Sequence, residues 1–230
     1  MLERRNLLGL TAVMGLVVAT GVRATDMDHK GRVVATAVTA HAGMAEVTCN
    51  DSKGWTFDVQ ASEDGGRDVV TVRISSPTNA MPPQFGVFYR VPGAGVQNVW
   101  ISDSGKDGCH LWPQLWWDWS AKYTSQLAKD TPIAVGFNAT EVAPVALACS
   151  EAFEAIDFGL YADDRTGEIV GRCEFFVRPT TPIRTYAVSV LLDRRGLGFA
   201  ETVRDCTAWI SRQNGFRTAD VPEAAYDPLY

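Results

Sequence analysis

The fold is decided by residues 55–75, which read WTFDVQASEDGGRDVVTVRIS. On both sides of the central turn, β-branched and aromatic side chains recur with a period of two, as in strands that bury one face. Between them lies Glu63-Asp64-Gly65-Gly66, which suits a tight reversal because glycine accepts the positive φ angles that such a turn needs. This stretch therefore predicts a hairpin with strands at 55–59 and 68–75.

The same pattern recurs along the chain, where short β-rich runs are separated by clusters of Gly, Pro, Asn and Asp. One of these clusters, residues 163–167, suits a slightly longer hairpin loop. The further predicted strands are 84–91, 97–102, 132–137, 143–149, 155–162, 169–177 and 183–192. We therefore predict a mainly β fold, a large antiparallel β-sandwich of two stacked sheets.

Near the end of the chain the period changes from that of a strand to that of a helix. Apolar residues recur at spacings of four, three and four, which places them on one helical face: Phe199, Val203, Cys206 and Ile210. Trp209 is expected beside this stripe, and Gly198 and Gly215 are typical start and stop signals. Residues 218–230 contain two prolines and read as a connector.

The first residues have the pattern of an export signal. Arg4-Arg5 precede an apolar run at 7–18, and Val22-Arg23-Ala24 offers a small-residue cleavage site. This arrangement resembles a twin-arginine signal, with a frayed helix or a membrane anchor as the alternative. We expect a signal helix at 1–24, a polar lead-in at 25–45, the sandwich at 46–197, and the helix and connector at 198–230. The expected location is periplasmic or secreted, without membrane attachment after the signal is removed.

Composition and charge narrow the class of partner. The chain has 230 residues, of which 46% are hydrophobic and 21% charged, as in a globular protein. Its net charge is -6 and its Lys and Arg residues are scattered, so we do not expect it to bind nucleic acid. The chain has five cysteines, an odd number that allows one or two disulfides but equally buried thiols, particularly Cys149 and Cys173.

No motif in the sequence marks catalysis, a cofactor or a metal. Residues 103–108 resemble half of a calcium loop, but Gly105 replaces a ligand and Gln114 stands where the bidentate Glu belongs. The three histidines are not paired at metal-ligand spacing. We therefore predict no catalytic residues, no metal site and no cofactor on this chain.

A tryptophan-rich segment at 111–119 holds four of the seven tryptophans. Indole faces stack on the apolar faces of sugar rings, while carboxylates and amides bond the hydroxyls. The alternative is that these rings close the open end of the sandwich or an interface with another domain. The candidate carbohydrate-binding residues are Trp112, Gln114, Trp116, Trp117, Asp118 and Trp119.

Three segments together resemble the N-terminal β-sandwich of family-36 glycoside hydrolases, the α-galactosidase group. They are residues 123–135, beginning Tyr-Thr-Ser-Gln-Leu-Ala, residues 145–152, ending Ser-Glu-Ala, and the late helix with the residues up to Tyr230. In that family a helix and a Pro-containing connector lead from the sandwich into a catalytic (β/α)₈ barrel. The catalytic aspartates lie on that barrel, and they have no counterpart in this chain.

The resemblance implies a noncatalytic carbohydrate-associated module from a truncated or split α-galactosidase-like enzyme. Its expected partners are a galactoside or another carbohydrate, and either a separate catalytic barrel or a second copy of the chain. Two alternatives stay open. The chain is an α-galactosidase-type hydrolase acting with a partner barrel, or it is an exported structural or protein-interaction domain.

Overall fold

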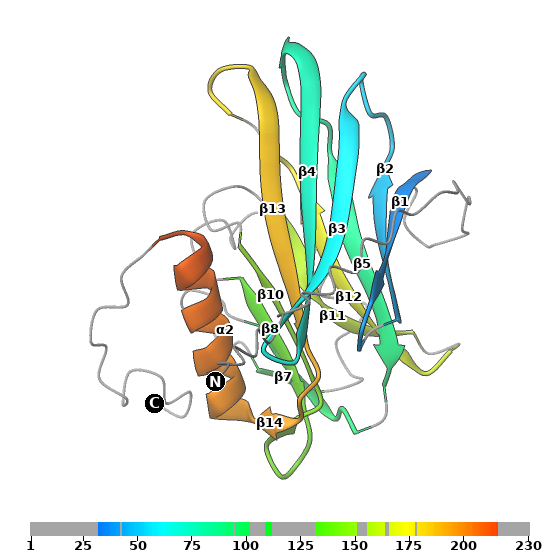
Figure 1. Cartoon of the computed structure of the whole chain (residues 1–230). Helices are drawn as coiled ribbons and strands as arrows, with labels where there is room; N and C mark the ends of the chain where they lie inside the picture. Colours follow the sequence, from blue (N-terminus) through cyan, green and yellow to red (C-terminus); the bar gives the residue numbers. More distant parts are fainter. Residues whose placement is uncertain are drawn as a thin grey trace, which may run out of the picture.

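The computed structural model describes residues 32–41, 43–93, 95–101, 109–111, 132–150, 156–163, 166–177 and 179–215. Within these residues the protein is mainly β, with two large antiparallel sheets followed by a C-terminal helix (Figure 1). The predicted fold class is confirmed at this level. The signal helix expected at 1–24 and the connector expected after the helix lie outside the described residues.

One sheet has five strands in the order β1-β2-β5-β12-β11, and every neighbouring pair is antiparallel. Its strands are β1 (Arg32–Thr39), β2 (Gly43–Cys49), β5 (Phe85–Pro92), β12 (Glu168–Phe175) and β11 (Ile156–Asp163). Three of the predicted strands, at 84–91, 155–162 and 169–177, lie in this sheet.

The other sheet has seven strands in the order β3-β4-β13-β10-β8-β6-β7. They are β3 (Thr56–Asp64), β4 (Arg67–Ala80), β13 (Ile183–Asp193), β10 (Val145–Cys149), β8 (Ile133–Phe137), β6 (Asn98–Ile101) and β7 (Cys109–Leu111). A small sheet pairs β14 (Leu197–Gly198) with β9 (Val142–Ala143). The long strands β4 and β13 extend beyond the rest of the sandwich at the top of Figure 1.

The first hairpin differs from the sequence-based expectation. Residues 32–39 and 43–45, assigned above to a polar lead-in, form β1 and the start of β2. Residues 32–39 read RVVATAVT, a run of small and β-branched residues that does not alternate regularly between apolar and polar positions. Val33, Ala37 and Thr39 are buried in the sandwich, where β1 pairs with β2 and lies close to β3 of the other sheet. The sandwich therefore includes strands that sequence periodicity did not mark.

The turn that opened the sequence analysis has the predicted geometry. Asp64 pairs with Arg67 across a two-residue loop, and Gly65 and Gly66 have φ angles of 59° and 81°. A side chain at either glycine would be strained in this left-handed region. The hairpin of β3 and β4 is therefore set by local sequence, as expected.

The main core lies between the two large sheets and is built from residues of both. Phe85 of β5 stacks on Phe175 of β12 at a ring-centroid distance of 4.8 Å. The Tyr89 hydroxyl crosses the sandwich and donates to the Val190 carbonyl of β13 at 3.3 Å. Each fully buried side chain of this size contributes about 1.5–3 kcal/mol of transfer free energy. Core burial therefore holds the two sheets face to face.

A second core lies on the outer face of the seven-stranded sheet, under helix α2 (Phe199–Gln213). Phe199, Cys206 and Ile210 of the predicted stripe are buried there, while Val203 is partly buried. Trp209, expected beside this stripe, is also fully buried in the same contact. No helix among the described residues has both the length and the apolar character needed to cross a membrane.

Candidate functional site

The six residues predicted to bind carbohydrate all lie in segment 112–119, outside the described residues. The same holds for the calcium-like segment 103–108. The sugar platform inferred from tryptophan density therefore stays a prediction.

A pocket opens at the edge of the sandwich, where β1 of one sheet lies close to β3 of the other. It has a volume of about 370 Å³, and we call it the edge pocket. Its walls combine the start of β1, the β2–β3 connection and the start of β3. The residues used below are Arg32, Cys49, Asp51, Ser52, Trp55 and Phe57.

A tight turn at 52–55 shapes one wall of the edge pocket. The Trp55 backbone N–H donates to the Ser52 carbonyl at 2.8 Å, and the Asp51 carboxylate accepts the Lys53 backbone N–H at 2.9 Å. Lys53 and Gly54 have φ angles of 49° and 80°, both in the left-handed region. A non-glycine residue held there is strained and marks a turn that its surroundings fix firmly. The turn therefore fixes the positions of Asp51 and Trp55.

Two hydrogen-bond donors of the edge pocket have no partner among the described residues. The Trp55 side chain is only 3% exposed, and its Nε1–H is buried without an acceptor. Arg32 is exposed at the start of β1, and its guanidinium makes no hydrogen bond or ion pair with a described residue. A buried donor without an acceptor costs about 1–3 kcal/mol. The Trp55 Nε1–H is enclosed by protein, so of these two donors only the Arg32 guanidinium is open to solvent.

A buried carboxylate on β4 ties the two sheets together. Asp68 accepts the backbone N–H groups of Ala40 and His41 at 2.9 and 2.8 Å, and its Oδ1 lies 3.3 Å from His41 Nδ1. Its side chain is 1% exposed. Arg194 adds a hydrogen bond to the His41 carbonyl at 3.0 Å. These contacts hold the β1–β2 turn of one sheet against the other sheet, which is a structural role.

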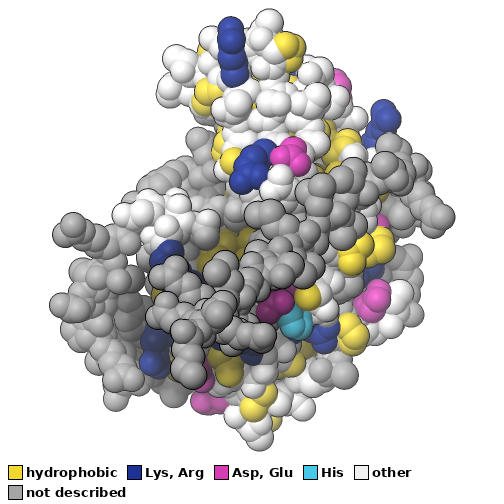
Figure 2. Space-filling model, in the orientation of Figure 1, with side chains coloured by type: hydrophobic (Ala, Val, Ile, Leu, Met, Phe, Trp, Pro, Cys, Tyr) yellow, Lys and Arg dark blue, Asp and Glu magenta, His cyan; other side chains and the backbone are white. Residues whose placement is uncertain are grey.

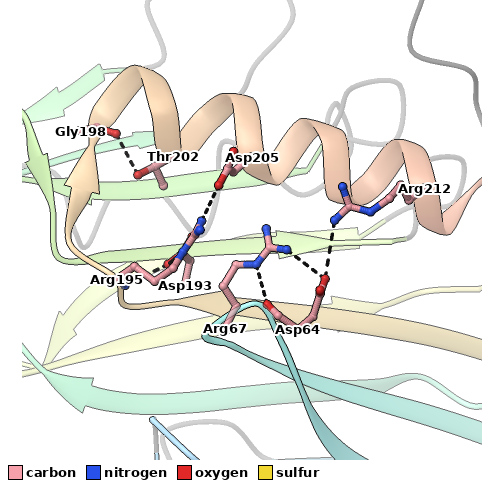
Figure 3. A network of polar contacts seen from close by, with 8 residues as sticks. All are labelled: Asp64, Arg67, Asp193, Arg195, Gly198, Thr202, Asp205 and Arg212. Carbon is pink, nitrogen blue, oxygen red and sulfur yellow. Dashed lines mark hydrogen bonds and ion pairs between the residues drawn. The ribbon is translucent and has the colours of Figure 1, made fainter.

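Figure 3 shows a polar network between α2 and the sheet beneath it. The Arg195 guanidinium binds Asp193 at 2.6 Å and Asp205 of the helix at 2.7 Å. Hydrogen bonding to Asp193 raises the pKa of Arg195, which keeps the guanidinium charged. On the same side, Asp64 pairs with Arg67 at 2.9 Å. Guanidinium groups engage these carboxylates, so we assign the network to docking of the helix.

Four of the five cysteines have described side chains, and these four agree with the prediction of buried thiols. Cys49, Cys149, Cys173 and Cys206 are buried and reduced. Burial raises the pKa of the Cys206 thiol to about 12 and also raises that of Cys49. Since the thiolate is the reactive form, burial leaves Cys206 and Cys49 poorly reactive at neutral pH.

The described residues contain no group of three or more His, Cys, Asp or Glu side chains able to hold a metal ion. On the face drawn in Figure 2, positive and negative side chains are scattered over the described residues rather than gathered into one patch. The sequence analysis missed the edge pocket. The turn-forming run Asp51-Ser52-Lys53-Gly54 directly before Trp55 was the signal that could have revealed it.

The fold and this geometry define a two-sheet, sandwich-like β protein with a helix on one outer face and a pocket at one edge. Comparisons with protein-family models, curated proteins and solved structures found no match.

Proposed function

We propose that this protein is a noncatalytic, carbohydrate-associated β-sandwich module of the kind found beside the catalytic barrel in α-galactosidase-like glycoside hydrolases. The resemblance of segments 123–135 and 145–152 motivates the family relation, and the antiparallel two-sheet architecture is compatible with it. The proposal includes export through the twin-arginine-like segment at 1–24, followed by a periplasmic or secreted location.

The edge pocket is the observation that carries the binding proposal. Ligand pockets of about 300–1,000 Å³ suit small molecules, and the edge pocket lies in this range at about 370 Å³. Its wall combines aromatic surface of the partly buried Phe57 with the polar side chains of Arg32 and Asp51, while Trp55 is only 3% exposed. Aromatic surface beside hydrogen-bonding groups is the combination that sugar rings require, because a pyranose has apolar faces and a polar rim. The tryptophan-rich segment would supply a second platform.

Titration of the purified full-length chain with galactose and with an α-galactoside tests this proposal. Binding is followed by calorimetry and by tryptophan fluorescence. We expect saturable binding that weakens in Trp116→Ala if the tryptophan-rich segment contributes, and in Arg32→Gln if the edge pocket does. A chain that binds no sugar, but self-associates through a surface lost in Trp116→Ala, would point to the interaction-domain alternative and overturn the proposal.

The noncatalytic part is tested separately with a chromogenic α-galactoside. Retaining hydrolysis needs two carboxyl groups about 5–5.5 Å apart across the scissile bond. We expect no turnover above the uncatalysed rate by the isolated chain. Turnover that persists through purification to homogeneity would contradict the proposal and establish the hydrolase alternative.

A further inference from the structure

The outer face of the five-stranded sheet is covered. Val170 of β12 and Phe88 of β5 are 0% and 1% exposed, yet neither belongs to the core between the sheets or to the core under α2. Val87, Tyr89 and Ile169, which flank them along the strands, point into the main core, so these two side chains point outward. On an open sheet face a side chain stays partly exposed, because its neighbours cover it only from the sides. Another part of the chain must therefore lie over this face.

Two charged side chains on the same face are also mostly buried. Arg172 and Glu174 of β12 form an ion pair at 2.6 Å, and their side chains are 14% and 18% exposed. Arg172 lies directly opposite Phe88 in the register of β12 and β5. Arginine and glutamate are mostly exposed at protein surfaces, so this burial again requires a cover. We call Phe88, Val170, Arg172 and Glu174 the outer-face cluster.

The described elements do not supply this cover. Helix α2 and the small sheet of β14 and β9 lie against the seven-stranded sheet, on the opposite side of the sandwich (Figure 1). The cover must come from residues outside the described ranges, of which the three longest segments are 1–31, 112–131 and 216–230.

Segment 112–131 is the best placed of the three. It joins β7 to β8, and both β8 and β6 lie close to β11, the edge strand next to β12. Adjacent strands are about 4.8 Å apart, so the segment passes over one strand to reach Val170 and over two to reach Phe88. At up to about 3.3 Å per residue, its length is ample for this path in both directions.

The other two segments are less suitable. Once the export signal proposed above is removed, residues 25–31 contain Met27 as their only large apolar residue. Residues 216–230 follow α2 on the opposite outer face and would have to pass around both sheets. Segment 112–131 instead carries four tryptophans, and each Trp side chain buries about 150–250 Å². It therefore has the apolar surface that a cover for Phe88 and Val170 needs.

We infer that residues 112–131 pack on the outer face of the five-stranded sheet, with the tryptophan-rich part over Phe88 and Val170. The inference rests on the proposed function in one respect, the removal of the export signal. It deepens that proposal because it gives the candidate sugar platform a place in the fold. Rings that contact the sheet support the platform, and only the remaining rings are open to a sugar.

Photo-cross-linking from the outer-face cluster tests this contact. Phe88 is replaced by p-benzoylphenylalanine in the full chain, and the cross-linked peptide is identified by mass spectrometry after irradiation. We expect a cross-link to a peptide from 112–131. The same group at Asp58, an exposed position on β3 of the other sheet, is the control and should give no cross-link to this segment. A cross-link from Phe88 to 216–230, or one formed only between two chains, overturns the inference.

A matched pair of milder variants gives a second test if the larger group at position 88 disrupts folding. Val170 and Val87 are both 0% exposed, but Val87 points into the main core. Trypsin cleavage after Lys122 or Lys129 reports how often segment 112–131 is detached. Val170→Ala should accelerate this cleavage by about tenfold, because it removes two buried carbon atoms from the contact. Val87→Ala should change it by less than about twofold, since detachment of the segment leaves the main core intact. Equal acceleration by the two variants overturns the inference.

The inference and the proposed function fail separately. A chain that binds no galactoside, but in which Phe88 cross-links to 112–131, overturns the proposed function and supports this contact. A chain that binds galactoside while Phe88 cross-links to another segment does the reverse. A cross-link to residues 1–24 overturns the inference together with the removal of the signal on which it rests.

Discussion

Replacing Asp68 by alanine should release the β1–β2 turn from the opposite sheet. The carboxylate accepts two backbone N–H groups, at 2.9 and 2.8 Å, and lies 3.3 Å from the His41 ring nitrogen. Hydrogen bonds to a charged group contribute about 1.5–3 kcal/mol each. Ala40 and His41 are exposed, so water can replace part of what they lose. We therefore expect a loss of about 3 kcal/mol in the free energy of unfolding.

Urea denaturation of Asp68→Ala, followed by tryptophan fluorescence and circular dichroism, measures this loss. In thermal melts of a protein of this size, the same loss should lower the melting temperature by about 6–12 °C, at about 2–4 °C per kcal/mol. Asp68→Asn keeps one acceptor oxygen and should lie between the wild type and Asp68→Ala. Asp58→Ala is the control, because Asp58 is an exposed carboxylate on β3, and its loss should change stability by less than about 0.5 kcal/mol. A difference of under about 1 kcal/mol between Asp68→Ala and the control would refute the reasoning.

Three further predictions concern other parts of the fold. Arg195→Met should lower the free energy of unfolding, measured by chemical denaturation, by about 3 kcal/mol, because it leaves the Asp193 carboxylate, whose side chain is 3% exposed, without its ion-pair partner. An unchanged free energy would mean that the ion pair is dispensable. Because burial raises the Cys206 pKa from 9.0 to about 12, the unfolded chain loses this proton before the folded one, and stability should fall as the pH rises above 9. Between pH 9 and pH 10, the free energy of unfolding of Cys206→Ala, measured by urea denaturation, should fall less than that of the wild type, by up to about 1.4 kcal/mol. An equal fall in the two proteins would contradict the assignment. Glu141→Gly should stabilise the protein by about 0.5–1 kcal/mol, since Glu141 has a φ of 60°, where glycine is not strained. Glu201→Gly, in the first turn of α2, should destabilise the protein. Changes in melting temperature of the same sign for the two variants would contradict this prediction.

The strands with strong local signals could be predicted from sequence. The β3–β4 hairpin follows from two glycines flanked by residues of period two, and both φ angles are positive as expected. The helix follows from the spacing of its apolar stripe. In contrast, β1 was not recognised, because residues 32–39 lack a regular alternation of apolar and polar side chains, and their burial depends on β2 and on β3 of the other sheet. β3 lies further along the chain and in the other sheet, so residues 32–39 alone do not reveal this burial.

The candidate site shows the same division. The density of tryptophans predicted a binding site in segment 112–119. The edge pocket is instead lined by one tryptophan, Trp55, and by Arg32, which is 23 positions earlier in the chain. Nothing in the spacing of these two residues indicates that they line one cavity. They meet because the edges of two different sheets, β1 and β3, lie together when the sandwich closes.

By itself, the sequence determined the mainly β class, the position of the late helix and the hairpin turn, because periodicity and glycine conformation act over a few neighbouring residues. Only the tertiary structure decided the strand order, the place of β1, the contact between Asp68 and the β1–β2 turn, and the edge pocket. Each of these depends on contacts between residues far apart in the chain, whose free energy is gained only when the sheets pack against one another.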